Sequence, residues 1–368
     1  MADSQLEQRP LLSKMAMDKI LSIIVPSYNM EAYLPKCLGS LVIDDRELFQ
    51  KLDVIVVNDG SKDRTSEIAH EFETKYPGVF RVIDKTNGNY GSCINVALSE
   101  INGLFVKVLD ADDWFDTGAL SDFIHFLNER GGDVDLVLSD YETMSIEGTV
   151  KERHTCIFPH YDIFGFDEFL KNKSYLAMHT YTYRSAMLKD MGYRQLEGFS
   201  YTDNEWILVP MAHVSTMRYF PKVIYKYVLG REGQTMSSSM LAKHSWMLTE
   251  VYLHIAKQID QLHDFASPTA KYFIEETEVA HLYGVYMDKI FHPEGALKEF
   301  NLLDFDARLK IASERLYELV GKRQYAHWLN YCMVDAWRRK SWSLGVRKCL
   351  CRLYSSIAMR LGAARGEN

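Results

Sequence analysis

The sequence predicts an α/β fold, with a mainly parallel sheet that has helices on both faces and a mostly helical C-terminal region. Two observations support this prediction. From residue 20 to about residue 140, short apolar segments rich in β-branched residues alternate with segments of helical spacing, which is the order that builds parallel sheets. From residue 241 onward, the pattern is helical and lacks acidic clusters.

The apolar segments have the composition of strands buried on both faces, and each ends in a loop carrying Asp, Asn, Ser or Gly. Such loops meet at one edge of a parallel sheet, where ligands bind. After residue 150 the alternation loosens, with short helices at 164–170 and 185–189 and a strand or hairpin at 216–228. We expect the main strands at 20–26, 52–57, 79–83, 104–109 and 135–139, and helices at 31–42, 61–76, 92–100, 117–130 and from 201.

The bulk composition excludes several classes of protein. A chain of 368 residues is too long for one core of usual size, and its net charge of −8 argues against a general nucleic-acid binder. The six cysteines lack zinc-ligand spacing and predict reduced thiols in a cytosolic protein. Residues 1–19 have no apolar core of signal-peptide length, and no segment matches a membrane helix, so we expect a protein that is neither secreted nor membrane-spanning.

The strand predicted at 104–109 ends in a cluster of three carboxylates, Asp110, Asp112 and Asp113. Charges this close raise one another's pKa unless a positive group lies among them. Divalent Mg²⁺ or Mn²⁺ would supply that charge, because these hard cations prefer carboxylate oxygens. The alternative is a polar loop or a helix cap, since Asp is common in both.

Three segments carry a family resemblance. Residues 22–29 (SIIVPSYN), 57–63 (VNDGSKD) and 109–114 (LDADDW) resemble the family 2 glycosyltransferases of GT-A fold, in particular bacterial enzymes of cell-surface and exopolysaccharide synthesis. Any one motif alone would be weak, but the three occur in the family's order and spacing.

The resemblance covers roughly residues 20–235. It implies a GT-A (Rossmann-like) catalytic domain over 20–235, with a nucleotide-binding half at 20–115 and an acceptor half at 116–235. A polar extension at 1–19 would precede it, and a helical region at 236–368 would follow.

The resemblance also implies a binding site for a nucleotide sugar, most readily a UDP-sugar. Asp59 matches the acid that accepts the uracil N3–H, while Asn58 stands where a second Asp is frequent in the family. The alternatives are a simple turn after Pro26 and a solvated surface charge at Lys85. The implied donor-binding residues are Pro26, Ser27, Tyr28, Glu31, Asp59, Lys85, Asn87, Gly88, Gly91, Asp110, Ala111, Arg231 and Gln234.

Asp110-Ala111-Asp112 matches the family's D-x-D motif. The resemblance assigns Asp112 to a bound Mn²⁺ or Mg²⁺ and Asp110 to the ribose or the metal. The cation would neutralise the nucleoside diphosphate as it leaves.

Residues 202–205 (TDNE) lie where the family commonly carries Glu-Asp. This match implies Asp203 as the general base of an inverting transfer, since a carboxylate beside the acceptor hydroxyl can take its proton. Thr202 departs from the usual Glu, which leaves Glu205 as a rival. The alternative is a helix first turn whose acids interact with the helix dipole.

The segment 231–235 resembles a loop that closes over the diphosphate, where Arg231 would pair a phosphate. A plain surface loop is the alternative. Trp114 and Trp206 could present a face to the acceptor sugar, although aromatic residues are more often core.

From Arg338 onward, basic residues alternate with apolar ones at helical spacing. Such a basic amphipathic helix can lie on an anionic membrane. The alternative is a helix packed on the protein with its basic side solvated.

The resemblance implies an inverting, metal-dependent glycosyltransferase of hexosyltransferase type, acting on a glycan or lipid-linked acceptor for cell-surface polysaccharide. We expect a cytoplasmic enzyme, with the inner face of the cell membrane as one place of action and a homo-oligomer as one form. The rival functions are a glycoside hydrolase, a nucleotidyltransferase and a non-catalytic nucleotide-binding module.

Overall fold

A computed structural model of the chain describes residues 19–132, 134–159, 162–171, 176–231, 234, 238–262, 265–292, 297, 300–324, 331–341 and 345. These residues form two compact units. The first contains the described residues up to Gln234 together with Phe265–Ala270, and the second contains those from 238 to 262 and from Lys271 onward.

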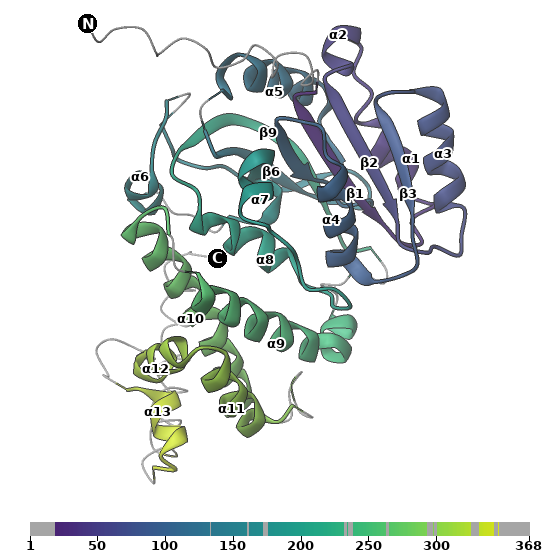
Figure 1. Cartoon of the computed structure of the whole chain (residues 1–368). Helices are drawn as coiled ribbons and strands as arrows, with labels where there is room; N and C mark the ends of the chain where they lie inside the picture. Colours follow the sequence, from purple (N-terminus) through teal and green to yellow (C-terminus); the bar gives the residue numbers. More distant parts are fainter. Residues whose placement is uncertain are drawn as a thin grey trace, which may run out of the picture. The chain divides into compact units, whose positions relative to one another are not determined.

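The first unit is built on a sheet whose N-terminal strands are parallel, as the sequence predicts (Figure 1). In the order β3-β2-β1-β4, these strands are Phe80–Asp84, Leu52–Asn58, Leu21–Ser27 and Phe105–Val108. β2 is buried at all seven positions because helices cover both faces of the sheet.

Helices α1 (Leu34–Gly39), α2 (Arg46–Phe49), α3 (Thr65–Lys75) and α5 (Thr117–Arg130) contribute to one apolar core with alternate residues of these strands. Helix α4 (Asn89–Glu100) contacts β1 and β2. The predicted helix at 117–130 is found with those bounds. The helix predicted at 31–42 is shorter, because α1 starts at Leu34, with a proline in its first turn.

The second half of the sheet is mixed. β6 (Leu136–Ser145) pairs parallel with β9 (Met217–Leu229) and antiparallel with β7 (Val150–His154) and β8 (Tyr181–Arg184). The segment expected as a strand or hairpin at 216–228 is therefore one long strand. The sequence reading missed β7 because every residue on it is at least partly exposed, so it carries no apolar pattern.

Short elements surround this half of the sheet. They include the two-residue strand β5 (Trp114–Phe115), the helices α6 (Phe166–Lys171), α7 (Ser185–Asp190) and α8 (Asp203–Leu208), and the 3₁₀ turns η2 (Met178–Thr180) and η3 (Pro210–Ala212). The β5 strand pairs antiparallel with β9, which brings β9 beside the carboxylate cluster of residues 110–113.

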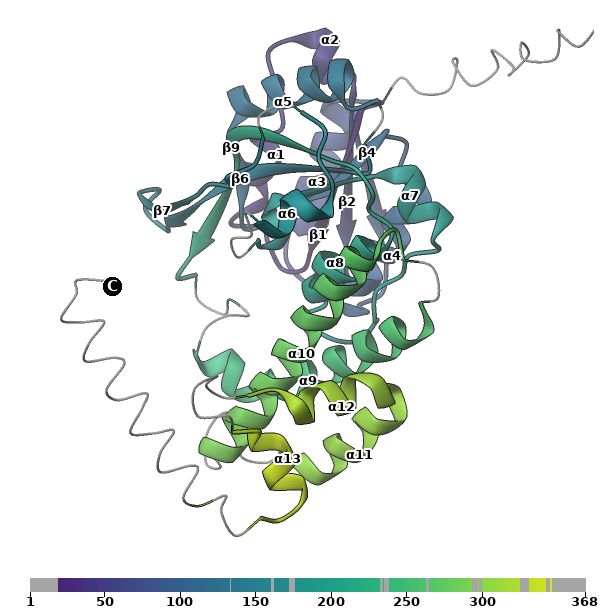
Figure 2. The same cartoon turned by 90° about the vertical axis from the view of Figure 1, so that its left-hand side faces the viewer.

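The described part of the second unit is helical (Figure 2). Its helices are α9 (Ser238–Gln261), α10 (Pro268–Phe291, whose first turn belongs to the first unit), α11 (Leu302–Ala312), α12 (Glu314–Lys322) and α13 (Met333–Arg338). Asn301 and Ser313 cap α11 and α12 by accepting hydrogen bonds from backbone amides, as N-cap side chains do.

Arg338 does not belong to a solvated basic face. Its guanidinium donates to Asp306 at 2.7 Å, stacks over the Tyr317 ring at 3.4 Å and is 12% exposed. This placement corrects the prediction for Arg338, because the ion pair and the ring hold it inside the unit. The predicted basic helix beyond residue 341 lies, apart from Gly345, outside the described residues.

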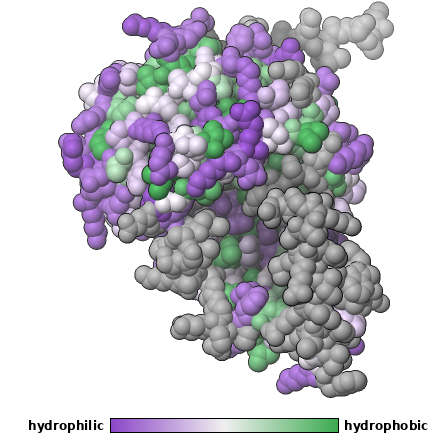
Figure 3. Space-filling model, turned by 180° about the vertical axis from the view of Figure 1, so that it is seen from behind, coloured by the Kyte–Doolittle hydropathy of each residue, from purple (hydrophilic) through white to green (hydrophobic). Residues whose placement is uncertain are grey.

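Within the described part of the chain, no helix is long and apolar enough to span a membrane. On the face shown in Figure 3, the coloured side chains of the first unit mix hydrophilic and hydrophobic residues.

Candidate active site

The loops that carry the motifs lie at one edge of the sheet. Parallel pairing aligns Ser27 at the end of β1 with Asn58 at the end of β2, and Asn58 in turn with Asp84 of β3. β4 lies on the other side of β1, so the carboxylates that follow β4 belong to the same edge. The strand ends that would form the predicted crevice are therefore neighbours in the sheet.

Asp59 is the centre of a compact group at this edge. Its buried carboxylate accepts from the Lys85 ammonium at 2.6 Å and from the Gly88 amide at 2.9 Å, both at Oδ1. The Asn87 side-chain amide donates to the Asp59 carbonyl at 3.0 Å. The structure thus brings together four of the residues predicted to surround the base.

The loop after β1 is fixed by the loop before α3. Asn29 has a left-handed backbone (φ 54°), and its side chain accepts from the Lys62 amide at 2.8 Å. Glu31 accepts from the Arg64 amide at 3.0 Å, so its carboxylate shapes this loop. Tyr28 is 42% exposed beside them. Pro26 and Ser27 belong to β1, Pro26 partly exposed and Ser27 buried.

Gly91 lies in the first turn of α4 at a place where no side chain fits. A Cβ there would come within 2.2 Å of the Leu196 carbonyl oxygen. The glycine is therefore explained by close packing of the 195–196 segment, which the Asn95 side chain also holds by donating to the Gln195 carbonyl at 2.9 Å.

The three aspartates after β4 have different surroundings. Asp110 accepts from the Tyr90 hydroxyl at 3.0 Å, and Asp112 accepts from Arg231 Nε at 2.7 Å. Burial, followed by the charge of Asp112, raises the pKa of Asp110 to about 7. Ala111 between them is 2% exposed.

Asp113 has an architectural role. It is 1% exposed, and its two oxygens accept from the Tyr225 hydroxyl at 2.8 Å and the Val228 amide at 2.7 Å. These bonds attach β9 to the cluster. Burial, then the charges of Asp112 and Asp110, raises the pKa of Asp113 well above its usual range.

Arg231 and Gln234 belong to the loop after β9. The Gln234 side chain closes this loop by donating to the Val228 carbonyl at 2.7 Å and accepting from the Gly230 amide at 3.1 Å. Gly230 has a φ of 100°, which suits glycine. The loop thereby holds Arg231 against Asp112, with the guanidinium also 5.4 Å from the Tyr33 ring centre.

The segment 203–206 separates its residues into different environments. Asp203 begins α8 and is partly exposed, and its charge raises the pKa of Asp110 after the larger effects of burial and Asp112. Glu205 is fully buried and accepts from the Leu196 amide at 2.7 Å. Trp206 is 1% exposed and packs edge-on against Tyr183, so its ring offers no face to a sugar here.

Trp114, the other predicted acceptor residue, is partly exposed on β5. The Lys36 ammonium lies 3.0 Å from the centre of its ring, a cation–π contact. One face of this indole is therefore already covered.

Sequence reasoning did not identify Tyr90, His179 and Tyr227. Burial raises the pKa of the Tyr90 hydroxyl, followed by the charges of Asp110 and Asp203, so it lies near both acids. His179 is buried against the Tyr227 ring at 4.4 Å, and burial lowers its pKa to about 3. Tyr90 stands in the same segment as Lys85, Asn87, Gly88 and Gly91, which is a signal for it, whereas tertiary contacts alone bring His179 and Tyr227 to the edge.

The oxygen donors of the cluster suit a hard divalent cation. Asp110 and Asp112 are neighbouring carboxylates, and the raised pKa of Asp110 shows that full negative charge is unfavourable there without a cation. Among the described residues, no three His, Cys, Asp or Glu side chains form a complete metal site on their own.

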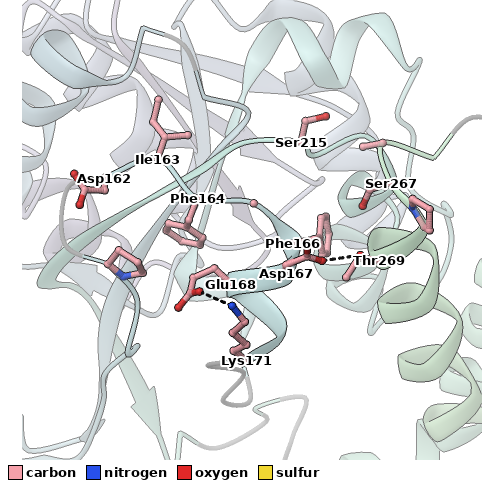
Figure 4. Close-up of a pocket in the computed structure, with 14 residues that line it drawn as sticks. Asp162, Ile163, Phe164, Phe166, Asp167, Glu168, Lys171, Ser215, Ser267 and Thr269 are labelled. Carbon is pink, nitrogen blue, oxygen red and sulfur yellow. Dashed lines mark hydrogen bonds and ion pairs between the residues drawn. The ribbon is translucent and has the colours of Figure 1, made fainter.

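A separate pocket of about 780 Å³ lies around α6 in the first unit (Figure 4). Its Asp167 accepts from Thr269 at 2.8 Å, and its Glu168 pairs with Lys171 at 3.3 Å. None of the motif residues lines it.

Comparison with known proteins identifies the domain that carries this edge. Residues 22–196 match the family model described as glycosyl transferase family 2. Over these residues the chain is similar to family 2 glycosyltransferases. The predicted family resemblance and GT-A fold are thereby confirmed.

Two curated relatives illustrate the match. An uncharacterized glycosyltransferase of Mycoplasma pneumoniae is 38% identical over 98 residues, which is 26% of this chain and 32% of that protein. The poly(ribitol-phosphate) beta-N-acetylglucosaminyltransferase TarS of Staphylococcus aureus is 29% identical over 241 residues, 65% of this chain and 40% of that protein. The chain thus spans well under half the length of these relatives.

The fold also matches a solved structure. The crystal structure of S. aureus TarS 1–349 in complex with UDP-GlcNAc has a TM-score of 0.57 and 22% identity. The match covers 87% of this chain and 92% of that one.

Proposed function

We propose that the chain is an inverting, metal-dependent glycosyltransferase that moves a sugar from a UDP-sugar to a hydroxyl of a cell-surface glycan or lipid-linked acceptor. One observation carries the proposal: Asp59 and the group of Asp110, Asp112 and Asp203 occupy one sheet edge of a domain similar to family 2 glycosyltransferases. A nucleotidyltransferase or a non-catalytic nucleotide-binding module remains the alternative.

The nucleotide would bind at the Asp59 group. The Asp59 carboxylate is held by Lys85 and Gly88 through Oδ1, and a carboxylate suits uracil because the N3–H is a donor. The related fold of TarS has been crystallised with UDP-GlcNAc, which supports a uridine nucleotide without naming the sugar.

Asp112 and Asp110 would hold Mn²⁺ or Mg²⁺, which would neutralise the diphosphate as it leaves. Arg231, now paired with Asp112 at 2.7 Å, lies where it can pair a phosphate through its planar guanidinium. Lys85 and Arg231 thus supply positive charge at two separate places along the nucleotide.

Asp203 is the proposed general base. It is partly exposed and lies near Asp110, whose pKa it helps to raise, so an acceptor hydroxyl can approach it. Glu205 is fully buried and holds the Leu196 amide, which favours Asp203 over its rival.

The acceptor side is proposed on family grounds, with Trp114 as the remaining aromatic candidate on β5. A lipid-linked acceptor would place the enzyme at the inner face of the membrane. Inversion is tested separately, by NMR of the anomeric configuration of the first product formed.

The first experiment measures thermal stabilisation by nucleotides with Mn²⁺ or with EDTA. We expect UDP with Mn²⁺ at 100 times its Kd to add about 2.7 kcal/mol to the free energy of unfolding, and Asp112→Asn to abolish the metal-dependent part. Release of pyrophosphate instead of UDP during turnover would favour a nucleotidyltransferase. No stabilisation by any nucleotide would exclude the donor site.

A further inference from the structure

Tyr227 lies on the wall of the acidic cluster. In the antiparallel pairing of β5 with β9, Trp114 is opposite Lys226 and Phe115 is opposite Tyr225. Continuing this register places Tyr227 opposite Asp113. The bonds from Tyr225 and Val228 to the Asp113 carboxylate fix the backbone on both sides of Tyr227.

The Tyr227 ring is held in place by packing. His179 lies 4.4 Å from its centre, and the opposing contacts of His179 with Tyr225 at 4.3 Å and Tyr141 at 5.1 Å restrain the imidazole in turn. The Lys107 side chain donates to the His179 carbonyl at 2.6 Å. A side chain so restrained is preorganised for binding.

The Tyr227 hydroxyl makes no hydrogen bond to any described residue, although four carboxylates act on it. Burial raises the pKa of this hydroxyl first, followed by the charges of Asp113, Asp110, Asp112 and then Asp203. The side chain is still partly exposed. A hydroxyl in this position has its donor available for a ligand.

We propose that Tyr227 is a specificity-determining residue whose hydroxyl hydrogen-bonds the sugar of the nucleotide-sugar donor, and that this sugar is uncharged. The proposal rests on the proposed function and deepens it. In the sheet order, β9 lies beyond β4, whereas Asp59 follows β2 on the opposite side of β1. The residue is therefore separated from the base-binding end and adjoins the cluster where the diphosphate and sugar would lie.

The chemistry of the surroundings selects the kind of sugar. A sugar hydroxyl can accept from Tyr227 and donate to a nearby carboxylate. A uronic acid would add a further negative charge beside Asp110, Asp112 and Asp203. The Arg231 guanidinium at this end is already paired with Asp112.

The test compares UDP with four UDP-sugars by calorimetry in Mn²⁺: UDP-glucose, UDP-galactose, UDP-GlcNAc and UDP-glucuronic acid. For the wild type, we expect at least one neutral sugar to bind more tightly than UDP. In Tyr227→Phe, the ratio of the Kd of UDP to the Kd of that UDP-sugar should fall about fivefold to tenfold, as expected for one lost hydrogen bond. The Kd of UDP itself should stay within twofold of the wild type.

Tyr219→Phe is the matched control. It makes the same change on the same strand but removes a hydroxyl that donates to Asp140 at 2.7 Å, so both affinities should stay unchanged. Equal weakening of UDP and UDP-sugar in Tyr227→Phe, no effect on either, or tightest binding of UDP-glucuronic acid would each overturn the inference. Failure of the wild type to bind UDP at all would refute the proposed function itself.

Discussion

Two acidic regions share one edge of the sheet, yet they are balanced differently. At Asp59, a single carboxylate is met by the Lys85 ammonium at 2.6 Å and by the Gly88 amide. After β4, Asp110, Asp112 and Asp113 lie close together, and Arg231 contacts Asp112. Burial and the neighbouring charge raise the pKa of Asp110 to about 7.

The difference indicates what each region needs before it can bind its part of a nucleotide sugar. The Asp59 region is complete within the chain, because its charge is already paired and its loop is hydrogen-bonded. The region after β4 carries an excess of negative charge, which a divalent cation would offset. We therefore expect the first region to govern which base is bound and the second to govern the chemical step.

The largest expected effect comes from Asp203→Asn, which keeps the shape and removes the base. We expect kcat to fall on the order of 10² to 10⁴-fold, while the Kd of UDP with Mn²⁺ changes little. The measurement is a coupled assay of UDP release together with calorimetry.

Glu205→Gln is the comparison variant, since that side chain is buried and holds Leu196. Glu205→Gln should lower the free energy of unfolding and should affect kcat less than Asp203→Asn does. If Asp203→Asn keeps kcat within tenfold of the wild type, the assignment of the base is wrong.

Asp59→Asn tests the Asp59 region. The Asn side chain carries no negative charge to strengthen a hydrogen bond from the uracil N3–H. UDP should therefore bind about 10- to 100-fold more weakly, as for loss of a charged hydrogen bond. Cytosine has an acceptor at N3, so the preference of the wild type for UDP over CDP should narrow in the variant.

Asp53→Asn is the control for this change. Asp53 is equally buried on β2 and pairs with Arg81 at 2.8 Å, away from the motif loops. It should lower the melting temperature and leave the UDP-to-CDP ratio intact. An unchanged UDP-to-CDP ratio in Asp59→Asn would mean that Asp59 does not recognise the base.

The Asp59 region was largely predictable from the sequence. Consecutive strands and helices place the loops after β1, β2 and β3 at one edge, so the location of Asp59, Lys85, Asn87 and Gly88 follows from chain order. Their predicted roles came from the family resemblance. The position of Asp110 and Asp112 follows from the same rule.

The other wall of the site was not predictable. The pairing of β5 with β9, which joins segments more than 100 residues apart, brings Tyr227 within the influence of the Asp113 charge. His179 comes from a 3₁₀ turn before the four-residue strand β8. The burial of Trp206 depends on Tyr183 of that same strand. Short strands and long-range registers leave no periodic signal in the sequence.

The smallest expected effect concerns a buried acid of the second unit, which is not one of the predicted site residues. Glu278 of α10 is fully buried, with His281 at 3.2 Å, and burial raises its pKa to about 7. Between pH 4.5, the ordinary pKa of this carboxyl, and pH 7, the folded state therefore binds more protons than the unfolded state. The free energy of unfolding should fall as pH rises through this window, by at most about 1.4 kcal/mol per pH unit.

Hydrogen exchange of α10 peptides at pH 5.5 and 7.5, corrected for intrinsic rates, measures this slope in the helical unit alone. Glu278→Gln keeps the shape and has no charge to titrate, so its opening free energy should depend less on pH than that of the wild type. Equal slopes in the two proteins would mean that Glu278 is charged in the folded state across this range. The interaction of Glu278 with His281, which lowers the pKa of this carboxyl, would then outweigh the effect of burial.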